Sequence, residues 1–155
     1  MAVVLATAAP STPPEGSILR TLVGYAFGYA LLGATWLVKH HLETTDSKMT
    51  HSVTKNWYAC ANTLTHCEAR LHMLQCTPRV PVPNACVKQI RRFLDTCLTE
   101  ENKFVRAWAY TGYCELAKSH PRYRKLVDEL LDDSEQHDPG ASVRARIRQL
   151  RTQRR

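Results

Sequence analysis

A short motif recurs three times along the chain, and this repetition limits the possible folds more than any other feature of the sequence. The copies are Glu68-Ala69-Arg70-Leu71, Phe104-Val105-Arg106-Ala107 and Ser142-Val143-Arg144-Ala145. Their arginines are 36 and 38 residues apart, and Ile90 and Leu94 recur as Leu126 and Leu130 after 36 residues. A period of this length is typical of arrays of helical hairpins. The sequence therefore predicts three helix pairs, at residues 50–77, 83–118 and 121–153.

Apolar residues within these pairs recur at spacings of three and four, as on one face of an α-helix. Pro and Gly interrupt the pattern at residues 77–83, at His120-Pro121 and at Asp138-Pro139-Gly140, and strand signals are scarce. The expected fold class is therefore all-α with short loops. The residues expected to line the core are Val53, Trp57, Ala61, Leu64, Leu71, Leu74, Gln75, Ile90, Phe93, Leu94, Cys97, Val105, Trp108, Ala109, Leu116, Leu126, Val127, Leu130, Leu131, Val143, Ile147 and Leu150.

Residues 101–150 resemble HEAT repeats and are similar to the HEAT-repeat domains that are common in bacterial proteins. The family has an acidic or Asn turn, then Val-Arg, then a small residue. The matching segments are Asn102…Val105-Arg106-Ala107 and Asp138…Val143-Arg144-Ala145, with Ala69-Arg70 as a looser copy. The resemblance implies a short HEAT-type α-solenoid of about three helix pairs (residues 50–153), preceded by an extra apolar helix. It also implies a ladder in which Arg70, Arg106 and Arg144 reach the acidic group of the preceding turn, with Asn102 and Asp138 as turn residues. The first copy has no acid at its turn, only Thr65 and His66.

The N-terminal part of the chain differs from the rest in amino-acid composition. Residues 1–17 are small and rich in Pro, which predicts a flexible lead-in, and residues 18–44 are predicted to form an apolar helix. Its segment Thr21–Val38 has no charged residue, is at the lower length limit for a bilayer span, and contains the close pair Gly24 and Gly28. Two alternatives follow: a membrane anchor that leaves the repeat domain in the cytoplasm, or a buried cap on one end of the stack in a cytoplasmic protein.

The cysteines and histidines offer little chemistry. Six cysteines at irregular spacings are expected to be mostly buried small residues of a reduced protein, with Cys76–Cys86 the pair to suspect if a disulfide forms. His66 and His72 lie near Cys67 in sequence, yet the spacing matches no metal-ligand or nucleophile pattern. No Gly-rich phosphate loop, HExxH or GxSxG is present. The sequence predicts a protein that is not an enzyme and that uses no cofactor.

The predicted function is a non-catalytic scaffold or adaptor whose concave face binds a protein partner. The formal net charge is +7, and the last fifteen residues contain six arginines and no acid. Two groups of basic residues lie about one repeat apart on two predicted helices and together form the predicted basic partner face. They are Lys88, Arg91 and Arg92 on one helix and Arg122, Arg124 and Lys125 on the next. Two alternatives stay open: nucleic-acid binding through this face, and an accessory subunit of a membrane complex held by Thr21–Val38.

Overall fold

The computed structural model describes residues 15–154, with side chains from residue 28 onward, and the described part is all-helical with no strand. The all-α prediction is therefore confirmed. The helices are α1 (Glu15–Thr44), α2 (His51–Ala59), α3 (Cys67–Cys76), α4 (Val87–Leu98), α5 (Lys103–Ser119), α6 (Arg124–His137) and α7 (Ala141–Arg154). Short 3₁₀ turns lie at η1 (Ala61–Thr63), η2 (Asn84–Cys86) and η3 (Pro121–Tyr123). Most of the predicted lead-in, residues 1–14, lies outside the described residues.

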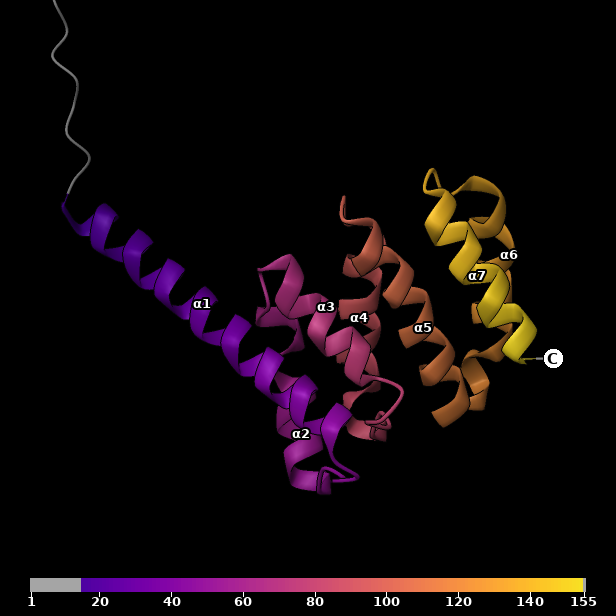
Figure 1. Ribbon diagram of the computed structural model, residues 1–155, viewed down its shortest axis with the longest axis horizontal. Helices are drawn as coiled ribbons and strands as arrows, with labels where there is room; N and C mark the ends of the chain where they lie inside the picture. The colour runs from indigo at the N-terminus through magenta and orange to yellow at the C-terminus, as the bar shows by residue number, and fades with distance from the viewer. Residues whose placement is uncertain (1–14, 155) are drawn as a thin grey trace, which may run out of the picture.

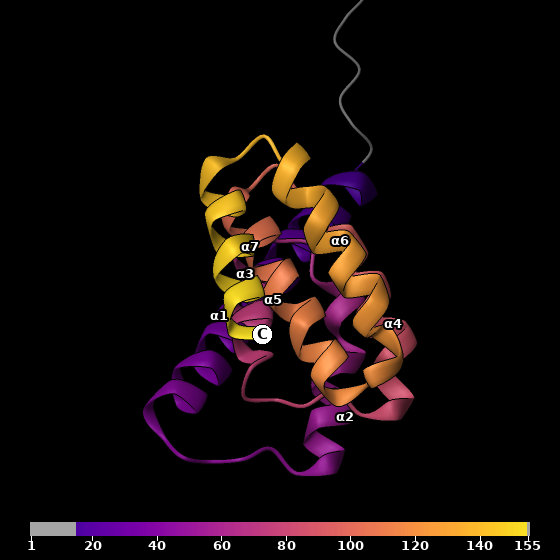
Figure 2. The same ribbon diagram turned by 90° about the vertical axis from the view of Figure 1, so that its right-hand side faces the viewer.

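The helices form two rows (Figures 1 and 2). Helix α3 contacts both α1 and α5, and α5 contacts α7, so these four odd-numbered helices follow one another in a single row. Helices α2, α4 and α6 lie on the other side, where α4 packs against α5 and α6 packs against both α5 and α7. Each predicted helix pair thus contributes one helix to each row.

Local capping explains where α3, α5 and α7 begin. The Asn102 side chain accepts a hydrogen bond from the backbone N–H of Phe104 (2.9 Å), which satisfies one of the free donors at the start of α5. At α3 the ring of His66 accepts in the same way from the backbone N–H of Glu68 (3.3 Å). At α7 the Asp138 carboxylate accepts from the N–H of Gly140 (2.7 Å). Polar turn residues therefore fix the ends of three helices in one row.

The core follows most of the predicted apolar stripes; Leu71, Trp108, Leu126 and Leu130 are half-buried and pack against it, whereas Gln75 is half-buried outside it and α2 departs from the prediction. Trp57, Ala61 and Leu64 are buried, but Val53 is 50% exposed, and Thr54 is buried in its place. The prediction that Val53 lines the core is wrong. The buried residues of α2 and η1 are spaced by three and four along the stripe that begins at Thr54, whereas Val53 lies beside this stripe with half of its surface exposed.

One loop ties distant helices together. The segment between α3 and α4 offers the backbone carbonyls of Val80 and Val82 as acceptors. The Tyr58 hydroxyl of α2 donates to Val80, and the buried His120 ring, just before η3, is 2.8 Å from the Val82 carbonyl oxygen through its Nε2 atom. A loop that carries three prolines is thus held by side chains from both directions along the chain.

Helix α1 packs beside α3 as the first member of its row, and its N-terminal end extends past the other helices (Figure 1). Leu42 is buried, and Leu31, Leu32 and Val38 pack against the core. Thr35 Oγ1 lies 3.2 Å from His72 Nδ1 of α3. In the part of the chain that the structure describes, no helix combines the length and the apolarity needed to cross a membrane.

Candidate functional site

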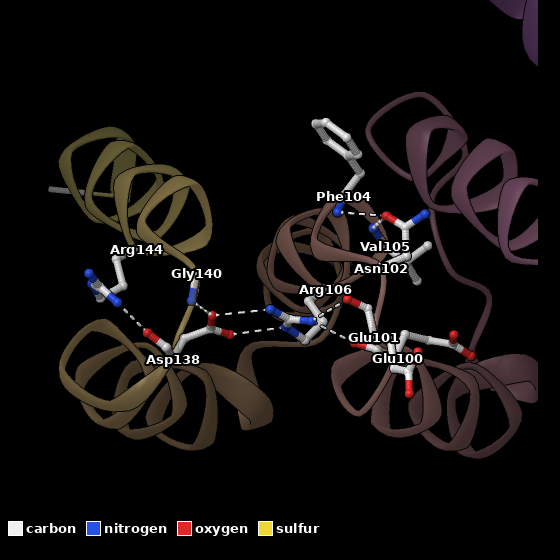
Figure 3. Close-up of polar contacts among 9 residues, drawn as sticks. All are labelled: Glu100, Glu101, Asn102, Phe104, Val105, Arg106, Asp138, Gly140 and Arg144. Carbon is white, nitrogen blue, oxygen red and sulfur yellow. Dashed lines mark hydrogen bonds and ion pairs between the residues drawn. The ribbon is translucent and has the colours of Figure 1, made fainter.

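The three motif arginines have equivalent positions near the starts of α3, α5 and α7. Each donates to the backbone carbonyl that lies six residues earlier in the chain. Arg70 Nε binds the Leu64 oxygen at 2.7 Å, Arg106 Nη1 binds the Glu100 oxygen at 2.7 Å, and Arg144 Nη1 binds the carbonyl oxygen of Asp138. These bonds hold the guanidinium groups against the turn that precedes each helix, and Figure 3 shows those of Arg106 and Arg144.

Two of the arginines also reach the following turn. Arg70 forms an ion pair with Glu100, and Arg106 Nε lies 3.3 Å from Asp138 Oδ2, with Nη2 3.5 Å from Oδ1. The Arg106 and Asp138 side chains are only 14% and 6% exposed, so solvent screens this pair weakly. Each arginine therefore connects two successive turns, and the carboxylate that it meets belongs to the next helix pair rather than to the preceding turn.

The role of Asn102 differs from that of the ladder turn residue, which the HEAT-repeat resemblance implies for it. Its side chain caps α5, whereas Glu100 occupies the ladder position that corresponds to Asp138. The sequence does contain a signal for this assignment, because Glu100 and Asp138 both stand six residues before a motif arginine. Leu64 stands at that offset before Arg70, so the first turn provides only a backbone acceptor.

The predicted basic face lies on the row of even-numbered helices. Lys88, Arg91 and Arg92 are exposed on α4, and the other three, Arg122, Arg124 and Lys125, are exposed in η3 and at the start of α6. Acidic residues share the exposed surface of α6, namely Asp128, Glu129, Asp132 and Asp133. Lys125 Nζ lies 3.8 Å from a carboxylate oxygen of Glu129. The structure brings the six basic residues onto one row of helices, where α6 also exposes carboxylates.

A second surface, which the sequence reading missed, lies on α5 and α7. Phe104 is 57% exposed and precedes Trp108 by one helical turn, so both side chains occupy one face of α5. The Arg146 guanidinium of α7 lies 4.8 Å from the centre of the Trp108 ring, and its Nε is 3.2 Å from the Thr111 hydroxyl. Two aromatic rings and a fixed cation thus form one patch, which we call the α5–α7 patch.

The surroundings of His72 and of the cysteines are those of packed side chains. Burial lowers the pKa of His72, and Lys39 acts in the same direction. All six cysteines are free; four are buried, as expected for small apolar residues, and Cys60 and Cys67 are half-buried. Burial raises the pKa of the thiols of Cys76 and Cys97 to about 12, so both are protonated at neutral pH and are poor nucleophiles. Among residues 15–154, no three His, Cys, Asp or Glu side chains gather closely enough to hold a metal ion.

No protein-family model, curated protein or solved structure matches this chain.

Proposed function

We propose that the chain is a short HEAT-type α-solenoid and that it acts as a non-catalytic protein-binding scaffold. Three helix pairs, α2–α3, α4–α5 and α6–α7, follow the motif period of 36 and 38 residues. The contacts of Arg70 and Arg106 support this assignment, because both join their own turn to the next one in the same way. A stack of this kind presents long continuous faces, which suit the binding of an extended partner.

The α5–α7 patch is the observation that carries the binding function. Trp, Arg and Phe are residue types that dominate the centres of protein interfaces. An exposed Phe104 leaves a large apolar side chain in water, which a partner would relieve. Lys103 and Arg146 lie over the two rings and contribute positive charge to the same surface. The partner that fits is a protein segment with an apolar side chain next to a carboxylate.

Selection of peptides from a random display library on the full chain tests this proposal. The selected peptides should converge on an apolar residue beside an acidic one, and Phe104→Ser should weaken their binding by at least about tenfold. Val53→Ser is the matched control, because Val53 is similarly exposed but lies on α2. Peptides that bind the Phe104→Ser and the wild-type chain equally would contradict the assignment of the partner surface.

Nucleic-acid binding is the second candidate function, and the exposed basic residues of α4 favour it. Binding that depends on phosphate contacts should weaken steeply between about 50 and 200 mM salt. Reversal of charge in the Lys88→Glu, Arg92→Glu double variant should then abolish it. The acidic residues on α6 oppose such binding, and an affinity for duplex or single-stranded DNA that is insensitive to salt and to this variant would eliminate it.

A further inference from the structure

Two histidines lie where α3 contacts α1. His66 is the residue just before α3, and the centre of its ring lies 6.5 Å from the centre of the Tyr29 ring of α1. His72 is half-buried on α3, and its Nδ1 atom lies 3.2 Å from Thr35 Oγ1 of α1. Histidine is the side chain that ordinarily changes its charge between pH 5 and 8. The contact between α1 and α3 therefore contains two groups that respond to mild acid.

The His66 ring caps α3 only while it is uncharged. Its Nδ1 atom accepts a hydrogen bond from the backbone N–H of Glu68 (3.3 Å), so this nitrogen carries no proton. In the protonated ring both nitrogens are donors, and the acceptor is lost. The positive charge would also stand at the N-terminal end of α3, where the helix dipole disfavours cations. Tyr29 of α1 faces this ring, and Asn102, in the turn before α5, contacts the adjoining Cys67 at 4.0 Å.

His72 responds through its charge and not through its hydrogen bond. The Thr35 hydroxyl donates to the carbonyl oxygen of Leu32 (3.0 Å), so its oxygen is left to accept from His72 Nδ1. That bond survives protonation, because the Nδ1–H group is present in both forms of the ring. Burial and the nearby Lys39 of α1 disfavour the charged ring, and they lower the pKa of His72.

The carboxylates near His72 offset this effect only in part. Glu68 of α3 and Glu43 of α1 favour the charged ring, but Glu43 also forms an ion pair with Lys39 at 2.7 Å. His66 acts against a charge on His72, so a proton on either ring makes a proton on the other less favourable. The docked arrangement of α1 on α3 therefore favours two uncharged histidines.

The other contacts of α1 have no charge of their own. Leu31, Leu32 and Val38 pack against the core, and Leu42 is buried. Among the side chains that the structure describes, from residue 28 onward, the bond between Thr35 and His72 is the only hydrogen bond that joins a side chain of α1 to another helix. The polar part of this contact thus depends on a histidine.

We propose that the contact between α1 and α3 is a pH switch, in which protonation of His66 and His72 in mildly acidic solution loosens α1 from the stack. Release would expose Leu42 and the side of α3 that α1 covers. The contact between α5 and α7 is of another kind, because Arg146 makes it with Trp108 and Thr111. These two helices should therefore stay together when α1 is released.

The direction of the response follows from the two forms of the chain. When α1 is released, the His72 ring is exposed and ionises near its ordinary pKa of about 6.5, whereas in the docked form burial lowers that pKa. Well above pH 6.5 both forms are uncharged, and docking has its full strength. As the pH falls below about 6.5 the released form takes up the proton first, so each proton shifts the equilibrium toward release by up to about tenfold per pH unit.

Hydrogen–deuterium exchange of the full chain, followed by mass spectrometry of its peptides, is the direct test. The protection of residues 31–44 of α1, corrected for the intrinsic exchange rate, should fall at least about fivefold between about pH 7.5 and 5.5. Protection in α5 and α7 should change less than about twofold over the same interval. Equal protection of α1 at both pH values would overturn the proposal. So would an equal fall in every helix, which is global acid unfolding.

The double variant His66→Asn, His72→Gln assigns the response to these two residues. Asn copies the cap of α5, where Asn102 accepts from a backbone N–H, and Gln can donate to Thr35 without taking up a proton. Protection of α1 in this variant should be the same at both pH values, and a persistent fall would contradict the assignment. His137→Gln, which changes an exposed histidine of α6, is the matched control and should keep the wild-type response.

Titration of the wild-type histidine rings by NMR gives an answer even if the double variant does not fold. The His72 ring should take up its proton with a midpoint below about 6.5, and amide signals of α1 should shift over the same interval. A His72 midpoint at or above that of an unfolded chain would show that docking does not oppose the proton, and the switch would be ruled out.

Discussion

Arg106 and Asp138 join two successive helix pairs through a nearly buried ion pair (Figure 3). The same guanidinium donates to the carbonyl oxygens of Glu100 and Glu101, at 2.7 and 2.9 Å. The Asp138 carboxylate in turn accepts the N–H of Gly140 at the start of α7. Three backbone groups, in the turns before α5 and α7, are therefore bound by the two side chains of one charged pair.

Asp138→Ala should lower the free energy of unfolding by roughly 2–4 kcal/mol, because it leaves the buried guanidinium without its countercharge and removes the bond to Gly140. Urea denaturation followed by circular dichroism measures the loss. Glu129→Ala is the control, since its partner Lys125 is 88% exposed and the change should stay within about 0.5 kcal/mol. If the two variants lost similar amounts of stability, the Arg106–Asp138 ion pair would not be a main contribution to the free energy of unfolding.

Asn102 and Glu100 should respond differently to substitution. Asn102→Asp keeps an acceptor for the first N–H groups of α5 and should be nearly neutral, whereas Asn102→Ala should lose about 1 kcal/mol. Glu100→Gln removes the charge that faces Arg70 but leaves the cap intact. Its loss should therefore disappear in an Arg70→Met background, while the Asn102→Ala loss should persist there, as a double-mutant cycle would show.

The helix pairs and the spacing of the arginines could be predicted from the sequence, because both follow from periodic patterns. The acidic partner of each arginine was harder to identify, since Asn102 and Glu100 stand two residues apart in one turn and only the geometry separates a cap from an ion pair. One position of the α2 stripe was wrongly assigned, because on a nine-residue helix Val53 and Thr54 fit the spacing to Trp57 almost equally well.

The position of α1 could not be predicted from the motif. Thr35 contacts His72, and the Tyr29 ring lies 6.5 Å from that of His66, so α1 runs beside α3 with an offset of 37 residues, close to the repeat period. The motif arginine is absent, since Ala34 stands 36 residues before Arg70. Helix α1 joins the row mainly through apolar contacts, which a search for Val-Arg segments does not detect.

Gly112→Val should destabilise the chain by about 2–3 kcal/mol, because a Cβ at this position would lie only 2.5 Å from a methyl group of the buried Leu94. Thermal unfolding of the variant measures the change. Gly28→Ala is the matched control: its Cβ meets no atom within 4 Å, so the change should be neutral or stabilising by up to about 1 kcal/mol. Equal effects would mean that α5 and α4 do not approach as closely as described.

Stability should fall at alkaline pH. Burial raises the pKa of the Cys76 and Cys97 thiols to about 12, and burial also raises the pKa of Tyr58. In the unfolded chain a thiol ionises near pH 8.5. Above that pH the unfolded state loses thiol protons that the folded state keeps, so each of the two thiols lowers the free energy of unfolding by about 1.4 kcal/mol per pH unit, and Tyr58 adds to this only above about pH 10.

The melting temperature should therefore decrease steadily from about pH 8.5 to pH 11. Cys97→Ala lowers stability at every pH, but it should reduce this slope by the contribution of one thiol. A melting temperature that is constant over this interval would show that the thiols are not buried in solution.

The loop between α3 and α4 has a consequence for how the chain unfolds. Stacked helix pairs that touch only their neighbours can open one unit at a time. Here Val80 is bound by Tyr58 of the first pair, and Val82 by His120 at the entrance to the last. Unfolding of either end breaks a hydrogen bond to this loop, so the stability of the middle helix pair depends on both ends. Amides of α2, α4 and α6 should accordingly exchange with solvent as one cooperative unit instead of in order along the chain.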